Sequence, residues 1–314
     1  MSERVLVIKL SALGDFIQAT GPMKAIRAAH PSARITLLTT RPYVGMARDT
    51  GWFDEVWSDG RPDWIDLPAV ARLIGRLRVG RFDRVYDLQT QSRTIRYFQL
   101  MWPTRAKWSG NAPGAAFHYS GEARDRLHIQ DSQREQLRIA GIAKVGPPDI
   151  AWMTGDAGKF GLAPPYALLA PGGAAHRPAK RWPAERFGAL AAGLLEQGIT
   201  PAVLGHGDEE AALADVILTR APGAVSLVGR TSFGDIADLA RGAALAVGND
   251  TGPMHIAVAA GVPAVVLFSR DSNPDLSAPR PIRGDQPVTI LREADLADMA
   301  VDRVSAAVAG LRSA

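Results

Sequence analysis

The stretch that most constrains the fold of this chain covers residues 243–268. It opens with a short apolar run, Ala243–Val247, which has the length of a buried strand. A tight polar turn leads into an alanine-rich helix expected from about Thr251 to Ala260. A Gly-Val-Pro sequence ends that helix, and Ala264–Phe268 has the composition of a second buried strand. A strand, a helix and a second strand in this order predict a parallel βαβ unit.

The polar turn of this unit predicts a ligand site, because ligands of open α/β sheets bind at the carboxyl ends of strands. The unpaired backbone N–H groups of Thr251 and Gly252 would form an anion site at the start of the helix. Gly252 lets a phosphate approach the backbone closely, and Pro253 suits the first helical turn. A helix capped by Asp250 or Thr251, with His255 as an interior histidine, explains the same residues without a ligand. Both interpretations stay open at this point.

Length and composition limit the possible functions. A chain of 314 residues with 46% hydrophobic content is long enough for two domains. Its net charge of +4, from 36 basic and 32 acidic residues, is too small to indicate a nucleic-acid partner. The chain has no cysteine, and its six histidines show no metal-ligand spacing. We therefore expect neither a metal nor another cofactor.

The start of the chain and its hydropathy predict a cytoplasmic protein. Met1 leads directly into an apolar strand, without the apolar region of a signal peptide. No apolar run approaches the ~20 residues that a membrane-spanning helix needs.

The first half of the chain alternates between expected strands and helices, which predicts a doubly wound parallel sheet. The expected strands are Val5–Ile8, Ile35–Leu38 and Val85–Leu88, and the expected helices cover residues 16–29, 67–77, 93–101 and 131–139. Gly14 and Asp15 stand in the turn after the first strand. The Asp15 carboxylate there is either a helix cap or a functional group at the ligand end of the sheet.

The second half repeats this organisation, so we expect a second Rossmann-like domain and a cleft between the two. We place the first domain at residues 1–150, a linker at 151–165 and the second domain at 166–294, from proline- and glycine-rich breaks. The last segment, 295–314, reads as an amphipathic helix, and we expect it to pack back on the first domain.

A glycine turn with cationic residues follows the strand Tyr166–Ala170. Gly172 and Gly173 form the turn, and Lys180 and Arg181 follow it, a composition that suits a diphosphate. Gly205-His206-Gly207 begins like a dinucleotide fingerprint, but Glu210 stands where the third glycine is required.

Three motifs together resemble glycosyltransferase family 9, the heptosyltransferases of lipopolysaccharide core synthesis. They are Val-Leu-Val-Ile-Lys9-Leu-Ser-Ala-Leu-Gly14-Asp15, Pro-Gly-Gly…Lys180-Arg-Trp182-Pro183, and Asn249-Asp250-Thr251-Gly252-Pro253-Met-His255. The resemblance implies a GT-B fold in which the first domain holds the acceptor and the second holds the nucleotide-sugar donor. It also implies inverting, metal-independent transfer, normally of heptose from ADP-heptose, to a lipid-linked glycan at the cytoplasmic face of the inner membrane.

The resemblance also implies roles for single residues. Asp15 matches the proposed base, Lys180 faces the diphosphate, and Asp250 matches a contact to the donor sugar. The full set expected at the donor is Gly14, Gly172, Gly173, Lys180, Arg181, Asp250, Thr251, Gly252, Pro253 and His255, with Asp15 and Lys180 as catalytic residues. Gly229 stands where some relatives carry an acidic residue that contacts the nucleoside, so the sequence leaves the donor's base open.

Two further questions stay open in the sequence. Tyr97–Trp108 mixes aromatic and cationic residues, which fits either an anionic lipid headgroup or a helix packed by its aromatic side chains. The alternative functions are a nucleotide-sugar epimerase or hydrolase on the same fold, and a non-catalytic binder of nucleotide sugars.

Overall fold

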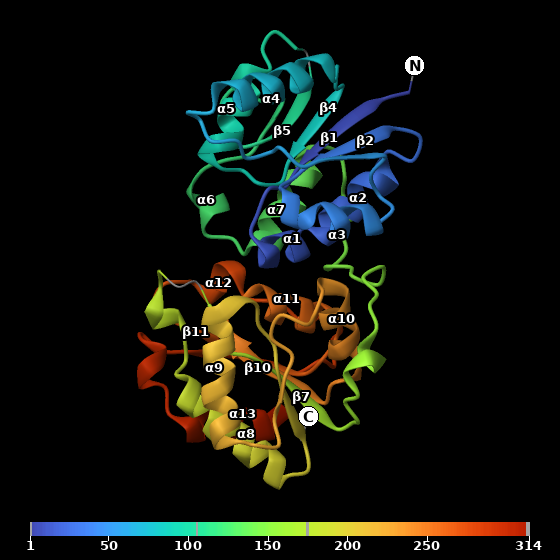
Figure 1. Cartoon of the computed structure of the whole chain (residues 1–314). Coiled ribbons are helices and arrows are strands. Elements are labelled where there is room, and N and C mark those ends of the chain that lie inside the picture. The colour runs from blue at the N-terminus through green and yellow to red at the C-terminus, as the bar shows by residue number, and fades with distance from the viewer. Residues whose placement is uncertain (1, 105, 174–175, 312–314) are drawn as a thin grey trace. The chain divides into compact units, whose positions relative to one another are not determined.

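The structure is a computed structural model that describes residues 2–104, 106–173 and 176–311. The chain divides into two compact units, Met1–Trp152 and Met153–Ala314. Each unit is a parallel sheet with helices on both faces (Figure 1), which confirms the predicted α/β class with two Rossmann-like domains. Within the described ranges, no helix has both the length and the apolar character needed to cross a membrane.

The first unit contains a sheet of six parallel strands in the order β3-β2-β1-β4-β5-β6. Its strands are β1 (Arg4–Ile8), β2 (Arg34–Leu38), β3 (Glu55–Trp57), β4 (Arg84–Asp87), β5 (Lys107–Gly110) and β6 (Phe117–His118). Its α-helices are α1 (Leu13–Gln18), α2 (Thr20–Ala29), α3 (Val44–Asp49), α4 (Leu67–Val79), α5 (Ser92–Leu100), α6 (Glu122–Asp125) and α7 (Ile129–Ile139), and Arg41–Tyr43 forms a 3-10 turn.

The second unit contains another six-stranded parallel sheet, in the order β12-β11-β10-β7-β8-β9. Its strands are β7 (Tyr166–Ala170), β8 (Thr200–Val203), β9 (Val225–Ser226), β10 (Leu245–Asn249), β11 (Ala264–Phe268) and β12 (Val288–Arg292). Its α-helices are α8 (Ala184–Glu196), α9 (Gly207–Arg220), α10 (Phe233–Gly242), α11 (Gly252–Ala259), α12 (Pro274–Ser277) and α13 (Val301–Leu311), with 3-10 turns at Ala157–Phe160, Pro178–Lys180 and Leu296–Asp298.

Both sheets have the same strand order when each is counted from its own first strand. In the first unit the chain order reverses between β1 and β4, and in the second between β7 and β10. Such a reversal opens a crevice at the carboxyl ends of the two strands, where doubly wound sheets bind ligands. The turns that follow β1, β4, β7 and β10 are therefore the positions at which functional side chains are expected.

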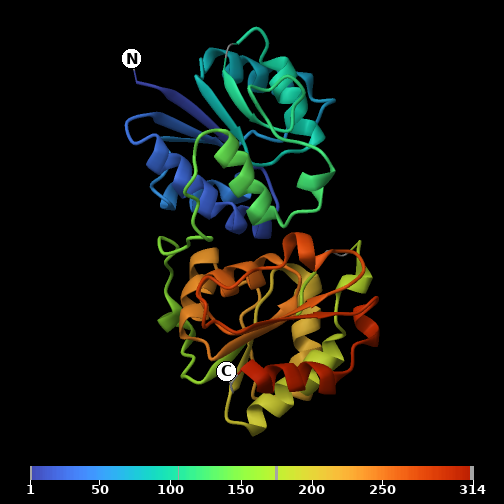
Figure 2. The ribbon, with the colours of Figure 1, turned by 180° about the vertical axis from the view of Figure 1, so that it is seen from behind.

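The core of the first unit forms because its strands are apolar on both faces. On one face, Leu6 and Ile8 of β1 pack with Leu73 and Leu77 of α4 and with Tyr97 of α5. On the other face, α7 covers the sheet and contacts both α2 and β5 (Figure 1 and, from behind, Figure 2). Burial on both faces is what makes these strands near-continuous apolar runs in the sequence.

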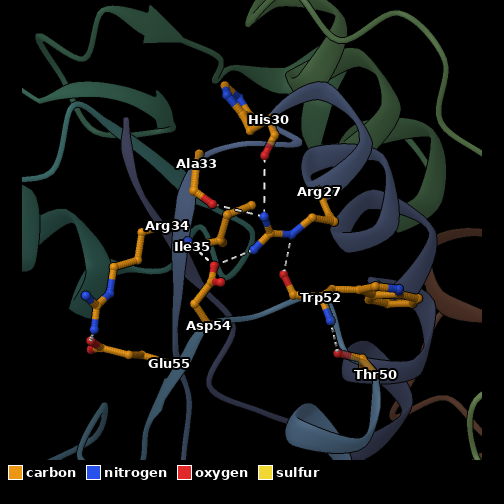
Figure 3. Close-up of polar contacts among 9 residues, drawn as sticks. All are labelled: Arg27, His30, Ala33, Arg34, Ile35, Thr50, Trp52, Asp54 and Glu55. Atoms are coloured by element: carbon orange, nitrogen blue, oxygen red, sulfur yellow. Dashed lines mark hydrogen bonds and ion pairs between the residues drawn. The ribbon is translucent and has the colours of Figure 1, made fainter. Parts of the chain in front are cut away.

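Arg27, near the end of α2, ties this helix to the strands that follow it (Figure 3). Its Nε donates to the carbonyl oxygen of Trp52 at 2.7 Å, and its Nη1 donates to that of Ala33 at 3.0 Å. Its Nη2 donates at 2.6 Å to the Asp54 carboxylate, which also accepts the backbone N–H of Ile35. One guanidinium thus fixes the connections on both sides of β2.

The carboxyl-terminal helix packs on the second unit, so the expectation that it would pack on the first domain is wrong. Helix α13 lies beside α8 (Figures 1 and 2) and contacts β10, β11 and β12. The apolar side chains of this segment are buried in the core of the second unit; they are Leu296, Met299, Val304, Val308 and Leu311. The reason is that β10 and β11 present an apolar face beside α8, which this stripe covers directly.

Most of the segment expected as a linker belongs to the second unit, where it packs against α10. The backbone N–H of Asp156 donates to Asp235 Oδ1 at 3.0 Å, and Lys159 Nζ lies 2.8 Å from Asp235 Oδ2. Gly155 lies so close to the backbone of Gly234 and Asp235 that a Cβ at position 155 would clash. The proline and glycine residues around 161–165 therefore mark a turn inside the second unit.

We predict that Val304→Ala destabilises the second unit alone. Val304 is fully buried in the core of that unit, and removing two methyl groups there should cost roughly 2 kcal/mol. Hydrogen exchange should speed up in peptides from α8, β10 and β11 and stay unchanged in β1 and β4. Ala306→Ser, at an exposed position of the same helix, is the control. Faster exchange in β1 and β4 would contradict the placement of α13.

Candidate functional site

Asn249, the last residue of β10, connects the two strand ends at the reversal of the second sheet. Its side chain is buried, and Nδ2 donates to the carbonyl oxygens of Pro171 at 2.8 Å and Gly172 at 3.1 Å. Its Oδ1 accepts the backbone N–H of Trp182 at 3.2 Å. One amide therefore fixes the turn after β7 and the segment that carries Lys180, both relative to β10.

Lys180, Asp250 and His255 form a cluster directly beyond this amide. Lys180 Nζ lies 2.7 Å from Asp250 Oδ2, and the two side chains are 13% and 10% exposed. His255 Nε2 lies 3.5 Å from the other carboxylate oxygen. Burial raises the pKa of Asp250, but the contacts to His255 and Lys180 outweigh it and hold that pKa at about 2. Asp250 is thus an ionised acceptor at neutral pH.

Helix α11 begins with free backbone donors at this cluster. Thr251 occupies the N-cap position but makes no capping bond, since its hydroxyl donates to the Asn249 carbonyl oxygen at 3.2 Å. Within the described ranges, the backbone N–H groups of Thr251 and Gly252 have no hydrogen-bond acceptor. Thr251 is thus the N-cap residue, as the interpretation without a ligand expects, but it supplies no capping bond, and the donors at the helix start can bind an anion. Pro253 occupies the first turn, as expected.

His255 lies inside the second unit, one helical turn below the free donors. It is buried, and its Nδ1 has no hydrogen-bond partner in the part of the chain that the structure describes. Its contact to Asp250 makes it a supporting residue behind the carboxylate, in agreement with the interior interpretation.

The glycine turn after β7 is packed against the start of α9. A Cβ at Gly172 would lie 2.1 Å from Glu210 Oε1, so a larger residue there would displace this carboxylate. Glu210 in turn accepts the backbone N–H of His206 at 2.8 Å. Arg181 donates from Nη2 to the carbonyl oxygen of Gly173 at 2.6 Å and pairs with Glu209. The structure therefore places Arg181 as a support of this turn.

In the first unit, Asp15 and Gly14 lie in the first turn of α1, which begins at Leu13 and not at Phe16. The Asp15 carboxylate is partly exposed and accepts the backbone N–H of Ala12 at 3.4 Å. It is a third-position residue of the helix and not its N-cap. Gly14 and Asp15 thus belong to the first unit, and the other expected donor residues belong to the second.

Two charged groups, Lys9 and Asp87, are buried near the carboxyl ends of β1 and β4. Lys9 Nζ donates to the carbonyl oxygen of Leu88 at 3.3 Å. Burial lowers the pKa of Lys9, and the charges of Asp15 and Asp87 oppose this shift. Burial raises the pKa of Asp87 to about 6, although hydrogen bonds and the charge of Lys9 act against it. The charges of Lys9, Asp15 and Asp87 therefore act on one another near the end of β1.

Gln89, which sequence analysis did not identify, positions the turn that carries Asp15. Its Oε1 accepts the backbone N–H groups of Leu10 at 2.9 Å and Ser11 at 3.2 Å. The following residue, Thr90, has φ +48°, an uncommon value for a residue with a side chain. The only sequence signal for either residue is polar character directly after an apolar strand. Asn249 is likewise a polar residue directly after an apolar run, and it stands inside the donor motif.

The aromatic residues of Tyr97–Trp108 differ in their burial. Tyr97 and Trp108 are buried in the core of the first unit, as the packing interpretation predicts. Trp102 is 76% exposed.

Among the described residues, no group of three or more histidine, aspartate or glutamate side chains converges as a set of metal ligands.

Two parallel sheets with one strand order, each with polar residues at its reversal, are the architecture of the GT-B class of proteins. The comparison with family models identifies the family. The model of glycosyltransferase family 9 (heptosyltransferase) matches residues 70–294, and the chain belongs to this family. It is a glycosyltransferase.

Individual relatives are heptosyltransferases by name. Lipopolysaccharide heptosyltransferase 2 of Escherichia coli is 24% identical over 308 residues, covering 88% of this chain and 85% of the relative. Lipooligosaccharide heptosyltransferase 2 of Haemophilus influenzae is 34% identical over 105 residues, which is 32% of this chain and 30% of that protein.

Solved structures share the fold over nearly the full length. A glycosyl transferase of family 9 from Veillonella parvula has a TM-score of 0.80 and 21% identity, covering 98% of this chain and 97% of the other. The E. coli heptosyltransferase WaaC with ADP has a TM-score of 0.74 and 19% identity, covering 98% and 99%. WaaC has also been solved with ADP-2-deoxy-2-fluoro heptose.

The buried Asp87 predicts a pH dependence of stability. With a pKa of about 6 in the folded state against 3.8 ordinarily, the folded chain binds more protons than the unfolded chain between these values. The free energy of unfolding should therefore fall as the pH rises through this window. Asp87→Asn keeps an acceptor for the N–H groups of Gln89 and Thr90 but removes the titration.

The measurement is urea unfolding of both proteins between pH 4 and pH 7, about the window that the two pKa values define. Relative to Asp87→Asn, the parent should lose up to about 3 kcal/mol across it. A constant difference between the two proteins would show that Asp87 does not titrate there.

Proposed function

We propose that this glycosyltransferase moves heptose from ADP-heptose to a lipid-linked lipopolysaccharide acceptor, with inversion at the anomeric carbon and without a metal ion. The observation that carries this proposal is the Lys180–Asp250 pair beside the free donors of α11. The nucleotide and the sugar are inferred from relatives: WaaC structures hold ADP and a fluorinated ADP-heptose. The acceptor is inferred from the names of the heptosyltransferase 2 relatives.

The second unit supplies what the leaving diphosphate needs. An ammonium has three N–H donors, and Lys180 uses one of them on Asp250. The other two, together with the N–H groups of Thr251 and Gly252, can bind phosphate oxygens and stabilise the charge that develops on ADP. These donors supply positive charge that a Mg²⁺ ion would otherwise provide. The ionised Asp250 is available to accept hydrogen bonds from sugar hydroxyls.

The first unit supplies the base. The acceptor hydroxyl attacks the anomeric carbon, and its proton passes to the Asp15 carboxylate as the bond between carbon and diphosphate oxygen breaks. One displacement on the face opposite ADP inverts the configuration. The turn that carries Asp15 is fixed by Gln89, so little reorganisation is needed when the hydroxyl arrives.

The experiment that tests the function measures ADP release from ADP-heptose with and without a heptose-deficient lipopolysaccharide acceptor. Acceptor-dependent ADP release together with a heptosylated product supports transfer. Release of free heptose without acceptor would favour a hydrolase, and ADP-heptose binding without turnover would favour a binder. The same assay with EDTA should proceed at an unchanged rate; loss of activity that Mg²⁺ restores would contradict the metal-free mechanism.

We predict that Lys180→Ala weakens ADP binding about 10- to 100-fold, since a charge-assisted hydrogen bond contributes about 1.5–3 kcal/mol. The uncompensated Asp250 charge would add repulsion. Isothermal titration with ADP measures the effect. Lys159→Ala is the matched control, because it removes another lysine–aspartate pair of the second unit, that with Asp235. ADP affinity within about twofold of the parent would remove Lys180 from the donor site.

We predict that Asp15→Asn lowers turnover ~10²–10⁴-fold, the usual contribution of a general base. The asparagine keeps the size of the side chain and an acceptor for the Ala12 N–H, so the melting temperature and ADP affinity should stay unchanged. Asp49→Asn, at an exposed position of the same unit, is the control. A variant that transfers at the parental rate would reduce Asp15 to a residue of the first helical turn.

A further inference from the structure

We propose that Lys9 is a positioning residue for sugar transfer, which holds the turn after β4 and through it the segment that carries Asp15. Lys9 directly follows β1 and is 1% exposed, so it lies too deep to contact a substrate. It acts indirectly, through hydrogen bonds that lead from its ammonium to the turn of Asp15. This role rests on the proposed function, in which Asp15 is the base.

Lys9 differs from the other cations of the chain in its burial. Every other lysine or arginine that the structure describes is at least partly exposed. Burying an ammonium is costly, and an apolar side chain of similar length, such as methionine, would fill the same place without that cost. Burial lowers the pKa of Lys9, and the charges of Asp15 and Asp87 oppose this shift and favour the ammonium. A cation kept here at such a cost indicates a role for its charge and its N–H donors.

The first link runs from Lys9 to the turn after β4. Lys9 Nζ donates to the carbonyl oxygen of Leu88 at 3.3 Å, and among the described residues this is the one hydrogen bond of the ammonium. Gln133 of α7 donates to the same oxygen from Nε2 at 3.5 Å. The carbonyl group is therefore held from two sides, by a cation at the end of β1 and by an amide of the helix that covers the sheet.

The second link runs from the turn after β4 back to the turn after β1. Gln89 Oε1 accepts the backbone N–H groups of Leu10 at 2.9 Å and Ser11 at 3.2 Å, which are the two residues after Lys9. The chain then enters α1, and Asp15 stands in the first turn of that helix. The Lys9 ammonium and the Gln89 amide thus close a ring of contacts that fixes the entry to the helix of Asp15.

Loss of the ammonium opens this ring at the Leu88 carbonyl, while the donor of Gln133 remains. The turn should then keep its fold but hold the Asp15 carboxylate less firmly. In enzymes a misplacement of about 1 Å can lower the rate about 100-fold. The chemical step should therefore slow, whereas donor binding by the second unit should not change. A role limited to stability would instead affect the rate in the same way whether or not Asp15 is present.

The test is a double-mutant cycle of Lys9→Met and Asp15→Asn in the full-length protein, with kcat and KM measured well below the melting temperature. Lys9→Met should lower kcat roughly 10- to 100-fold and leave the KM for ADP-heptose unchanged. In the Asp15→Asn background the same substitution should change kcat by less than about twofold, because no base remains to be positioned. Lys9→Arg, which keeps a cation with N–H donors, should recover part of the loss.

Lys24→Met is the matched control, because it removes another lysine of the first unit, which pairs with Asp149, and it should leave kcat unchanged. An equal loss of kcat in both backgrounds, or a loss that appears in the KM for ADP-heptose, would overturn the role of Lys9 and leave that of Asp15 intact. Parental turnover of Asp15→Asn alone would overturn both roles together. If Lys9→Met does not fold, Lys9→Gln, which keeps an N–H donor, replaces it in the cycle and is judged by the same outcomes.

Discussion

In both units an amide side chain at the sheet reversal fixes the turn on which the expected chemistry depends. Asn249 ends β10 and donates to two carbonyl oxygens in the turn after β7. Gln89 follows β4 and accepts two N–H groups in the turn after β1. Strands β4 and β10 hold equivalent places in the two sheets, as do β1 and β7. An amide suits this place because it donates or accepts as required and adds no charge to a buried site.

The charged residues near these amides differ between the units, in line with the different roles proposed for them. In the second unit one carboxylate, Asp250, is held ionised by Lys180 and His255, and the free donors of α11 remain beside it. In the first unit Lys9 is buried and interacts electrostatically with Asp15 and Asp87, and burial favours the neutral form of Asp87. The first arrangement offers donors to an anion, and the second leaves a partly exposed carboxylate near a buried cation.

The sequence predicts most of the fold because buried parallel strands are continuous apolar runs. Tyr166–Ala170 and Ala264–Phe268 match β7 and β11 residue for residue. The edge strands β3, β6 and β12 were not predicted, since an edge strand is short or half-buried and lacks that run. The internal strand β5 was not predicted either, because Lys107-Trp-Ser-Gly110 is not an apolar run. The position of α13 was also missed, because an apolar stripe shows that a helix packs but not on which surface.

Residues of the candidate site could be predicted where the type of side chain alone indicates a function. They could not be predicted where the role of a side chain depends on a partner far away in the sequence. Lys180 and Asp250 are 70 residues apart, but each comes after an expected buried strand, so both could be placed at the carboxyl edge of one sheet. Nothing in the sequence indicated that Gln89 bonds to the turn of β1, 78 and 79 residues away along the chain. The same holds for Glu210, whose contact with Gly172 requires α9 to lie beside the end of β7. Side chains that position others are therefore learned from the fold.

The parallel sheet of the first unit also separates two kinds of surface. Every crossover helix begins near the carboxyl ends of the strands and ends near their amino ends, so helix N–H groups gather at one edge and helix carbonyl groups at the other. Anion chemistry is favoured at the first edge, and cations are favoured at the second by the helix dipoles. Arg78 follows this rule, since it donates to a terminal carbonyl oxygen of α5. Arg81 and Lys107 go beyond it, because their donors reach no group of the described chain.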